Sequence, residues 1–408
     1  MIGKRQSGCN DLPARSTKLW GVGSRGSILL HLGRELVVAM RIVLMNDWFL
    51  YYTVQLANGL CEANEVMLIV RDHNREICGP GEVISVGDFL SETLDKRVRV
   101  DRMRYRRSDL RSFAEMMRIW KNVMRFGPEV IHVQDNSDWR IAFLFLLARK
   151  LRRVFTIHDV RSHSGERRGL QNVCRDAQLT HADRIIVHGS FLRQQLLDEH
   201  PEFSSRAFAI PHGAYTLYRK WDRGNTLIEP NTVLFFGRIS LYKGLDVLIS
   251  AQPAISAAVP GARIIIAGQG QPLEPYLQGI SDPRAFEIHN RFIPHREVAG
   301  LFRRAKFVVL PYLEASQSGV VALACAFGKP VVATQVGSLP EVVKHMQTGI
   351  VVPPGDPTAL AEAIVRLLKD ELLLQHLADG AARAADHELA WNNIAKVTVD
   401  AYNHGNTR

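Results

Sequence analysis

The sequence predicts two doubly wound α/β domains in succession, and three observations predict this fold class. Short apolar runs alternate with amphipathic helical patterns, which is typical of βα units around a parallel sheet. The length of 408 residues suits two or three domains. A polar stretch at residues 218–231 separates the first group of units from the second. We therefore expect domains at 40–220 and 221–387, with a hinge near 214–230.

The first domain is expected to contain six strands and intervening helices. The predicted strands are Arg41–Met45, Glu65–Val70, Val130–Val133, Val154–His158, Arg184–Val187 and Arg206–Ile210. The clearest helix runs from about Ser108 to Phe126. Its apolar residues step by three and four and so share one face, formed by Leu110, Phe113, Met117, Trp120 and Met124.

The second domain repeats the same alternation. Its predicted strands are Thr232–Gly237, Arg263–Ala267, Phe307–Leu310 and Pro330–Ala333, and its helices include Leu245–Ala258 and Val320–Phe327. Asp356 followed by Pro357 predicts a helix start, with an N-cap and a proline in the first turn, that continues to about Lys369. A last helix is expected at about Trp391–Asn403.

Residues 1–39 are set apart as an N-terminal extension. Four glycines interrupt the segment and its polar residues have no period. One interpretation is that Met40 is the natural start. An alternative is a short amphipathic helix from Ser27 to Ala39, and no cleavage site or proper hydrophobic region indicates a secretory signal.

Composition excludes several classes of protein. The longest apolar run, Ile141–Ala148, has eight residues, and a membrane-spanning helix needs about 20. The five cysteines are odd in number and widely spaced, so neither a disulfide framework nor a zinc site is predicted. A reducing cytoplasm is the simplest location.

The best candidate anion site follows the first strand of the second domain. Ligands of doubly wound sheets bind beyond the carboxyl ends of the strands. Gly237 and Arg238 stand at such an end, and Lys243 comes five residues after the arginine. The two cations can therefore converge on one phosphate. The alternative is a pair of solvated surface cations.

Other strand ends in this domain supply weaker candidates. Gly268 and Gly270 form a Gly-x-Gly turn, which by itself is weak evidence of a phosphate cradle. The start of the helix at Ser318 and Gly319 offers free N–H groups to an anion. Glu314 suits a sugar or ribose hydroxyl, or else is a loop carboxylate near a helix start. Ser338 and Glu341 are interpreted as a capping box with a structural role.

Two histidines lie at strand ends of the first domain. His158 ends the strand that begins at Val154 and is a candidate for contact with a ligand, although a lone histidine is more often structural. His212 precedes the linker and is a weaker candidate.

Together these residues resemble a family 4 retaining glycosyltransferase with the GT-B fold, from Met40 onward. The matching motifs are Phe235–Arg238, Lys243–Ile249, Ala267–Gly270, Pro311, Ser318–Gly319, Ala326–Ala333 and Gly337–Glu341. The resemblance implies two Rossmann-like domains facing across a cleft, with a C-terminal helix (388–408) crossing back to the N-terminal domain. It implies a nucleotide-sugar donor and no other cofactor. Residues matching Arg238 and Lys243 hold the diphosphate in that family, and the histidine matching His158 lies near the transferred sugar.

The sequence departs from the family at two places. Of the two family glutamates separated by seven residues, Glu314 stands about one position from the first, and the second falls on Ala322 or Leu323. Gln317 or Ser318 is the expected substitute. The glycine-rich loop after the first strand is replaced by residues 46–49. The expected donor-binding residues are Gly237, Gly268, Gly270, Gln317, Ser318, Gly319 and Val320.

The mechanism expected from these residues needs no metal, since no Asp-x-Asp site is present. Arg238, Lys243 and the helix end at Gly319 would stabilise the departing diphosphate. Glu314 and His158 would bind sugar hydroxyls. Retention without an enzymic nucleophile implies attack on the face from which the diphosphate leaves.

The net charge of +10 bears on the acceptor. Residues 1–220 carry 34 Lys/Arg against 24 Asp/Glu, whereas residues 221–408 carry 17 of each. An anionic membrane attracts such a domain by ~1 kcal/mol per cation, so we expect a saccharide or lipid-linked acceptor of cell-envelope or exopolysaccharide synthesis. The enzyme would be cytoplasmic or peripheral on the inner face of the plasma membrane. The alternative is a helix that packs its apolar face in the core and leaves the basic face solvated. The expected membrane or acceptor surface comprises Arg104, Arg106, Arg107, Arg111, Arg118 and Lys121.

Two other functions fit parts of the pattern. A non-hydrolysing nucleotide-sugar epimerase shares the architecture and the anion site but needs no acceptor. A basic nucleic-acid-binding protein would explain the charge. However, the aromatic residues do not interleave with the basic runs, and the anion site lies in the neutral half.

Overall fold

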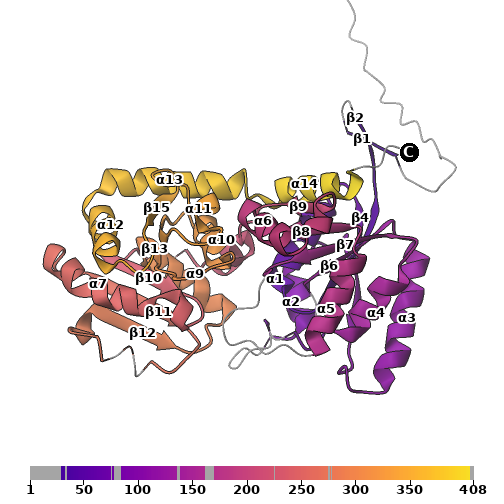
Figure 1. Ribbon diagram of the computed structural model, residues 1–408, viewed down its shortest axis with the longest axis horizontal. Helices are drawn as coiled ribbons and strands as arrows, with labels where there is room; N and C mark the ends of the chain where they lie inside the picture. Colours follow the sequence, from indigo (N-terminus) through magenta and orange to yellow (C-terminus); the bar gives the residue numbers. More distant parts are fainter. Residues whose placement is uncertain are drawn as a thin grey trace, which may run out of the picture. The chain divides into compact units, whose positions relative to one another are not determined.

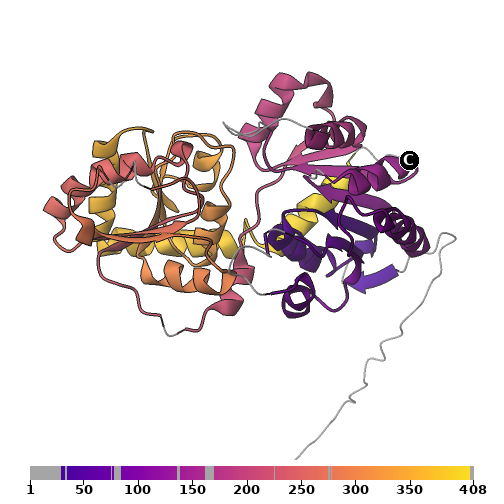
Figure 2. The same ribbon diagram turned by 90° about the horizontal axis from the view of Figure 1, so that it is seen from below.

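The computed structural model describes residues 29–32, 35–74, 76–77, 84–135, 138–160, 170–224, 226–273, 276 and 278–404 (Figures 1 and 2). The chain divides into two compact units, Met1–Met40 and Arg41–Arg408. In the first unit, β1 (Leu29–Leu32) pairs with β2 (Glu35–Val38) in antiparallel register, Leu29 opposite Val38. The alternative of a short helix from Ser27 to Ala39 is therefore wrong. Val37 and Val38 are strong strand formers, which agrees with this pairing. The rest of the extension lies outside the described residues.

The second unit begins with a seven-stranded parallel sheet in the order β5-β4-β3-β6-β7-β8-β9. Its strands are β3 (Arg41–Asn46), β4 (Glu65–Arg71), β5 (Arg99–Met103), β6 (Val130–Gln134), β7 (Arg152–Ile157), β8 (Arg184–Val187) and β9 (Ala207–Ala209). The six predicted strands are confirmed. The seventh, β5, is an edge strand whose charged residues resemble a basic loop, and for that reason its pattern gave no strand signal.

Helices connect these strands. They are α1 (Leu50–Leu60), α2 (Val86–Thr93), α3 (Arg111–Phe126), α4 (Trp139–Leu147), α5 (Leu170–His181), α6 (Ser190–Glu199) and the 3₁₀ turns η1 (Pro201–Phe203) and η2 (Thr216–Trp221). The core beneath them contains Val43, Ile131 and Phe155, none of which is exposed.

The helix α3 is confirmed, but most of its predicted apolar face does not pack in the core, so the alternative given for its basic side does not hold. Leu110, just before the helix, and Phe113 and Met117 on it are all exposed. The helix instead buries a second stripe, which includes Ser112, Glu115, Met116, Ile119, Val123 and Phe126. Glu115 is buried because its carboxylate accepts hydrogen bonds from the backbone N–H groups of Arg104 and Tyr105, at 2.9 and 3.2 Å. A stripe that contains a buried glutamate and a serine does not look apolar in sequence.

A second parallel sheet follows, with six strands in the order β12-β11-β10-β13-β14-β15. The strands are β10 (Thr232–Phe236), β11 (Arg263–Gly268), β12 (Phe286–Asn290), β13 (Phe307–Leu310), β14 (Val331–Thr334) and β15 (Gly349–Val352). The four predicted strands are confirmed and are the inner ones. The two edge strands, β12 and β15, were not predicted.

The helices of this sheet include the two most explicit sequence predictions. They are η3 (Leu241–Lys243), α7 (Leu245–Ala258), η4 (Pro283–Ala285), α9 (His295–Arg304), α10 (Gly319–Ala326), α11 (Leu339–Val342), α12 (Pro357–Lys369), α13 (Glu371–Asp386) and α14 (Trp391–Asn403). Helix α12 begins as predicted, since the Asp356 carboxylate accepts from Thr358 N and Ala359 N at 3.0 Å each. Helix α14 has the predicted bounds and packs against α1.

The two parallel sheets, each with its own helices, give two α/β domains. The residue limits set out above for these domains, for the extension and for the C-terminal segment stay predictions.

Candidate functional site

The loop after β10 places two cations at the carboxyl end of an inner strand. Gly237 has φ +123°, a value that residues with a Cβ rarely adopt, and this turns the chain out of the strand. Arg238 follows on the surface, and η3 brings Lys243 back toward the sheet. A Cβ on Gly237 would lie 3.5 Å from Val320 Cγ2. The loop therefore lies against the first turn of α10.

Lys243 is half-buried and its ammonium group lies over an aromatic ring. Its Nζ is 3.6 Å from the ring centroid of Tyr312 and 4.9 Å from that of Tyr242. Burial, together with a smaller repulsion from Arg238, lowers the pKa of Lys243 to about 8, although Tyr242 and the Asp159 carboxylate oppose the shift. The two predicted cations are thus close enough to interact, and Asp159, just beyond β7, lies near the same ammonium group. An anion between the cations would relieve their repulsion.

The start of α10 completes this cationic region. Ser318 is its N-cap residue but makes no capping hydrogen bond with its own side chain. The Ser318 hydroxyl lies 3.4 Å from the Tyr312 hydroxyl. Gln317 Oε1 is buried and has no hydrogen-bond partner among the described residues. The first N–H groups of a helix carry partial positive charge, so an anion is favoured here.

Gly268 and Gly270 have a structural reason to be glycine. A Cβ on Gly268 would lie 1.8 Å from Gly237 O, and a Cβ on Gly270 would lie 1.9 Å from Ile239 O. The loops after β10 and β11 therefore run in backbone contact, with a bridge between Ile239 and Gly270. Contact of either glycine with a donor stays a prediction.

Glu314 is exposed on the loop after β13. Its backbone N–H donates to Tyr242 O at 3.4 Å. Its carboxylate forms no hydrogen bond or ion pair with any described residue. The structure does not bring Glu314 into a network with the two cations.

His158 is fully buried at the end of β7. Its ring stacks on Phe49, with centroids 3.6 Å apart and planes 12° apart, and its Nε2 lies 3.3 Å from Gln134 Oε1. Burial, reinforced by other histidines nearby, lowers the pKa of His158 well below its usual value, so the ring is neutral at pH 7. Its Nδ1 has no hydrogen-bond partner among the described residues. This nitrogen can therefore donate to or accept from a hydroxyl group.

His212 is also buried, and its Nδ1 lies 2.8 Å from Gly213 O. Its ring centroid is 6.3 Å from that of His158 and 5.0 Å from that of His188. Burial lowers the pKa of His212 to about 4. The three neutral rings form a packed group at the ends of β7, β8 and β9.

The capping box predicted at Ser338 and Glu341 is wrong. The Ser338 hydroxyl donates to Ser316 O at 2.7 Å rather than capping α11. The Glu341 carboxylate accepts from Ser190 N at 2.8 Å and from Phe191 N at 2.6 Å, and so caps α6 of the first sheet. The structural role holds, but the helix that is capped is a different one.

Three residues of the candidate site were not singled out from the sequence. Tyr312 carries the ring beneath Lys243, Phe49 covers His158, and Ser240 Oγ is buried without a hydrogen-bond partner in the described part of the chain. Ser240 lies between the two cations in sequence, which was a usable signal. The two aromatic residues resemble ordinary core residues, and only the fold shows what they cover.

The predicted basic surface is exposed. Arg104, Arg106 and Arg107 lie in the loop between β5 and α3. On α3, Arg111 pairs with Asp109 at 2.7 Å and Arg118 pairs with Asp101 at 2.8 Å, whereas Lys121 forms no ion pair with a described residue.

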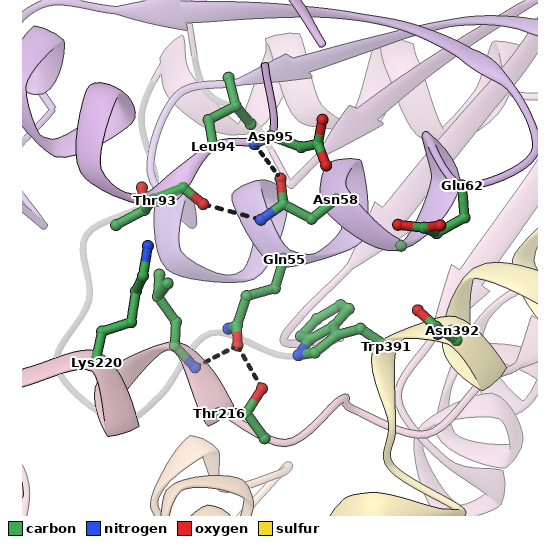
Figure 3. Close-up of a pocket in the computed structure, with 12 residues that line it drawn as sticks. Gln55, Asn58, Glu62, Thr93, Leu94, Asp95, Thr216, Lys220, Trp391 and Asn392 are labelled. Carbon is green, nitrogen blue, oxygen red and sulfur yellow. Dashed lines mark hydrogen bonds between the residues drawn. The ribbon is translucent and has the colours of Figure 1, made fainter. Parts of the chain in front are cut away.

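A pocket of about 390 Å³ lies away from the cations (Figure 3). Its walls come from α1, the end of α2, η2 and the start of α14, and the residues that line it are Gln55, Asn58, Gly59, Glu62, Thr93, Leu94, Asp95, Thr216, Leu217, Lys220, Trp391 and Asn392. Two of its amide groups are hydrogen-bonded within the chain: Gln55 Oε1 accepts from Leu217 N at 2.8 Å, and Asn58 Nδ2 donates to Thr93 O at 2.9 Å. The pocket lies where α1, α2 and α14 meet the linker that contains η2.

No helix in the described part of the chain is both long and apolar enough to span a bilayer. Within the same residues, no three or more His, Cys, Asp or Glu side chains are grouped so as to hold a metal ion.

Two protein-family models match the chain, one for each sheet. Residues 51–216 match "Glycosyltransferase Family 4" and residues 230–370 match "Glycosyl transferases group 1". The chain belongs to the family 4 type of glycosyltransferases. The motifs that carried the resemblance lie in the second match, around the two cations.

Curated relatives of this family 4 member match part of its length. An uncharacterized glycosyltransferase of Methanocaldococcus jannaschii is 34% identical over 178 residues, 43% of this chain and 45% of the relative. A glycogen synthase of Mycobacterium tuberculosis is 32% identical over 177 residues, 42% of each chain. A D-inositol 3-phosphate glycosyltransferase of Xylanimonas cellulosilytica is 33% identical over 183 residues, 43% of this chain and 42% of the relative. The chain thus spans less than half the length of these relatives.

Solved structures match the family 4 member over most of its length and show the fold. Sucrose-phosphate synthase of Thermosynechococcus elongatus superposes with a TM-score of 0.64 at 21% identity, covering 89% of this chain and 98% of the other. Anabaena HepE, solved in complex with UDP, gives a TM-score of 0.62 at 17% identity, covering 88% and 99%. The fold is GT-B.

Proposed function

We propose that the protein transfers a sugar from a nucleotide-sugar to an acceptor, with retention of anomeric configuration and without a divalent metal. The observation that carries the proposal is the position of Arg238 and Lys243 on one loop after β10, which lies against the first turn of α10. Family membership supports it, as do the curated relatives named as glycosyltransferases. The UDP-glucose complex of Anabaena HepE supports the class of donor.

The cations would stabilise the leaving group. Breaking the anomeric bond leaves negative charge on the diphosphate, and a catalyst must stabilise that charge as it develops. Lys243 supplies a point charge held over Tyr312, and Arg238 supplies a planar pair of donors. The N–H groups at Gly319 and Val320 point the positive end of α10 at the same anion. This arrangement performs the neutralisation that a metal ion provides in other enzymes.

The neutral groups would orient the sugar. His158 Nδ1 and Gln317 Oε1 are buried polar atoms without partners in the described chain, and a sugar hydroxyl satisfies either one. Glu314 and Ser318 are the remaining candidates for ribose or sugar contacts. We assign the role of nucleophile to none of these groups. Attack would occur on the face from which the diphosphate leaves, with a phosphate oxygen taking the proton of the acceptor hydroxyl.

The test begins with the donor. Thermal shifts against a panel of UDP-, GDP-, ADP- and TDP-sugars identify it, and transfer or slow hydrolysis is then measured for Arg238→Ala and Lys243→Ala. We expect a fall in kcat of at least 100-fold for each, since each removes charge stabilisation made in the transition state. Arg284→Ala is the matched control, because Arg284 is an exposed cation of the turn η4 before β12 and, among the described residues, its ion pair is with Asp282. Unchanged turnover in both site variants would refute the assignment.

The acceptor is proposed to be saccharide or lipid-linked, within cell-envelope or exopolysaccharide synthesis on the inner face of the plasma membrane. The charge asymmetry between the two halves of the chain supports a membrane-side acceptor. Product analysis distinguishes transfer from epimerisation, since an epimerase yields an isomerised donor with no acceptor present.

A further inference from the structure

The outer side of α3 exposes large apolar side chains. Leu110 is 94% exposed, Phe113 58% and Met124 49%. Together with Met117 they are spaced by three, four and seven residues along the sequence. These spacings place the four side chains in one stripe along the helix. Large apolar side chains exposed in a continuous patch mark an interaction site in soluble proteins.

Helix α4 extends this patch. Trp139, Phe143 and Leu147 stand four residues apart on α4, and each is 36–42% exposed. Helices α3 and α4 contact each other (Figure 1). The Trp139 indole N–H donates to Arg107 O at 3.2 Å, which ties the start of α4 to the loop before α3. The α3–α4 surface, as defined here, consists of Leu110, Phe113, Met117, Met124, Trp139, Phe143 and Leu147.

Exposed cations lie on the same elements as the α3–α4 surface and in the segments next to them. The exposed cations beside it are Arg104, Arg106, Arg107, Arg111, Arg118, Lys121, Arg125, Arg149 and Lys150. Two of them, Arg111 and Arg118, form ion pairs with aspartates. The other seven form no ion pair with a described residue, so their charge is available to a partner. A partner that fits this surface therefore offers apolar material to the exposed side chains and negative charge to the cations.

We propose that the α3–α4 surface docks on the face of an anionic lipid bilayer. Its apolar side chains would enter the region between the headgroups and the acyl chains, and its seven unpaired cations would contact lipid phosphates. A protein partner would more often receive aromatic and apolar residues in a core depleted of charge, whereas here exposed cations lie on α3 itself and in the segments that adjoin α3 and α4. The inference deepens the proposed function, since it rests on that function for the lipid-linked acceptor but not for the lipid contact itself.

The surface also predicts a direction of dependence on lipid and salt. Counter-ions screen the cationic contacts, with a Debye length of about 8 Å at physiological ionic strength. Binding should therefore require anionic lipid and weaken as salt rises. The contact of apolar side chains with the bilayer interior does not weaken as salt rises. Part of the binding seen at low salt should therefore persist at physiological salt.

The experiment is vesicle flotation of the full chain. Vesicles of phosphatidylcholine are compared with vesicles containing 30% phosphatidylglycerol, at low and physiological salt. We expect the protein to float only with the anionic vesicles. Phe113→Ser combined with Met124→Ser should reduce partitioning at least tenfold, and so should Arg106→Ala combined with Arg107→Ala. The matched control is Leu227→Ser combined with Leu372→Ser, because these residues are 84% and 87% exposed and lie outside both the α3–α4 surface and the donor site.

Further readouts keep the outcomes separate. All substituted residues are exposed, so the melting temperature should change little, and donor binding by thermal shift checks the fold of each variant. Absence of flotation with anionic vesicles, in a protein that still binds its donor, would overturn the docking surface and leave the proposed function intact. Flotation of a protein that binds no nucleotide-sugar would overturn the proposed function and leave the docking surface intact. A wild-type dimer that Phe113→Ser with Met124→Ser dissociates would also overturn the proposal, because the surface would then bind a second copy.

Discussion

The indole Nε1 of Trp391 donates a hydrogen bond of 2.6 Å to the backbone carbonyl of Ala214. The relationship ties the first residue of α14 to the linker between the two sheets. Glycines flank the indole residue on both sides: a Cβ on Gly213 would lie 2.6 Å from Trp391 Cζ2, and a Cβ on Gly59 would lie 2.6 Å from Trp391 O. The joint beside the pocket of Figure 3 is therefore packed without room for a methyl group.

Gly213→Ala should destabilise the protein. The added methyl group meets the indole ring well inside van der Waals contact, and relief of such overpacking costs about 1–3 kcal/mol. Gly300→Ala is the matched control, because Gly300 lies within α9 with nothing in 4 Å of its Cβ position. That change should be neutral or slightly stabilising. Thermal denaturation compares the melting temperatures of the two variants. Equal values would contradict the prediction, because they would mean that the chain around Trp391 shifts to make room for the methyl group.

Glu341→Ala should lower stability by about 1 kcal/mol, the usual contribution of a helix cap. Its carboxylate takes the place of a capping side chain for α6, where the N-cap residue is Gly189. Glu341→Gln keeps one acceptor oxygen and should lose less. Glu388→Ala removes an exposed partner of Lys344 and serves as the control, with an expected effect below 0.5 kcal/mol. The order of melting temperatures, control above Gln above Ala, is the predicted result.

Much of the fold could be predicted because its inner strands are short apolar runs with turn residues at their ends. The edge strands β5 and β12 were missed, since an edge strand has one neighbour and tolerates charged residues such as Arg99 and Glu287. The edge strand β15 carries no charge, but it is a run of four residues that begins with a glycine and so gave little strand signal. Periodicity found α3 but not its orientation. The helix has an apolar stripe on two sides, and only the contact of Glu115 with backbone N–H groups shows which side is inward.

The candidate site also contains residues that the sequence indicates and residues that only the fold shows. Arg238 and Lys243 could be proposed from the sequence because they follow a strand end and stand next to glycines, and their role as a donor site stays a prediction. Tyr312 could not, since its role comes from a ring that reaches an ammonium group 69 residues earlier in the chain. Glu341 was assigned to the nearest helix, because a sequence pattern identifies local caps and cannot reveal a cap supplied to a distant helix.

Tyr312→Leu should weaken nucleotide binding more than Tyr312→Phe. The ring beneath Lys243 holds the ammonium group by a cation–π interaction, which contributes about 0.5–2 kcal/mol, or roughly 2–30-fold in affinity. Phenylalanine keeps that ring and loses only the long contact of the hydroxyl with Ser318. Isothermal titration with the nucleoside diphosphate of the true donor measures both. Equal losses in the two variants would assign the effect to the hydroxyl.

Nucleotide affinity should fall as the pH rises through about 8. Lys243 has its pKa lowered to about 8 by burial in the unliganded protein, and a bound diphosphate favours the charged ammonium group and so raises that pKa. Below about pH 8 the lysine is charged in both states and affinity is constant. Above it, binding must first take up a proton, and the dissociation constant rises by up to tenfold per pH unit.

The range above pH 7 isolates the lysine, since phosphate groups with a second pKa near 6 are already ionised there. Titration calorimetry from pH 7 to 9.5 should show the break, together with proton uptake that scales with the ionisation enthalpy of the buffer. Lys243→Arg keeps its charge over this range and should give a flat profile. Lys329→Met is the control, because burial lowers the pKa of Lys329 to about 8 as well, but its ammonium group is bonded to Ala305 O. A break that follows Lys329 instead of Lys243 would place the titrating group outside the proposed site.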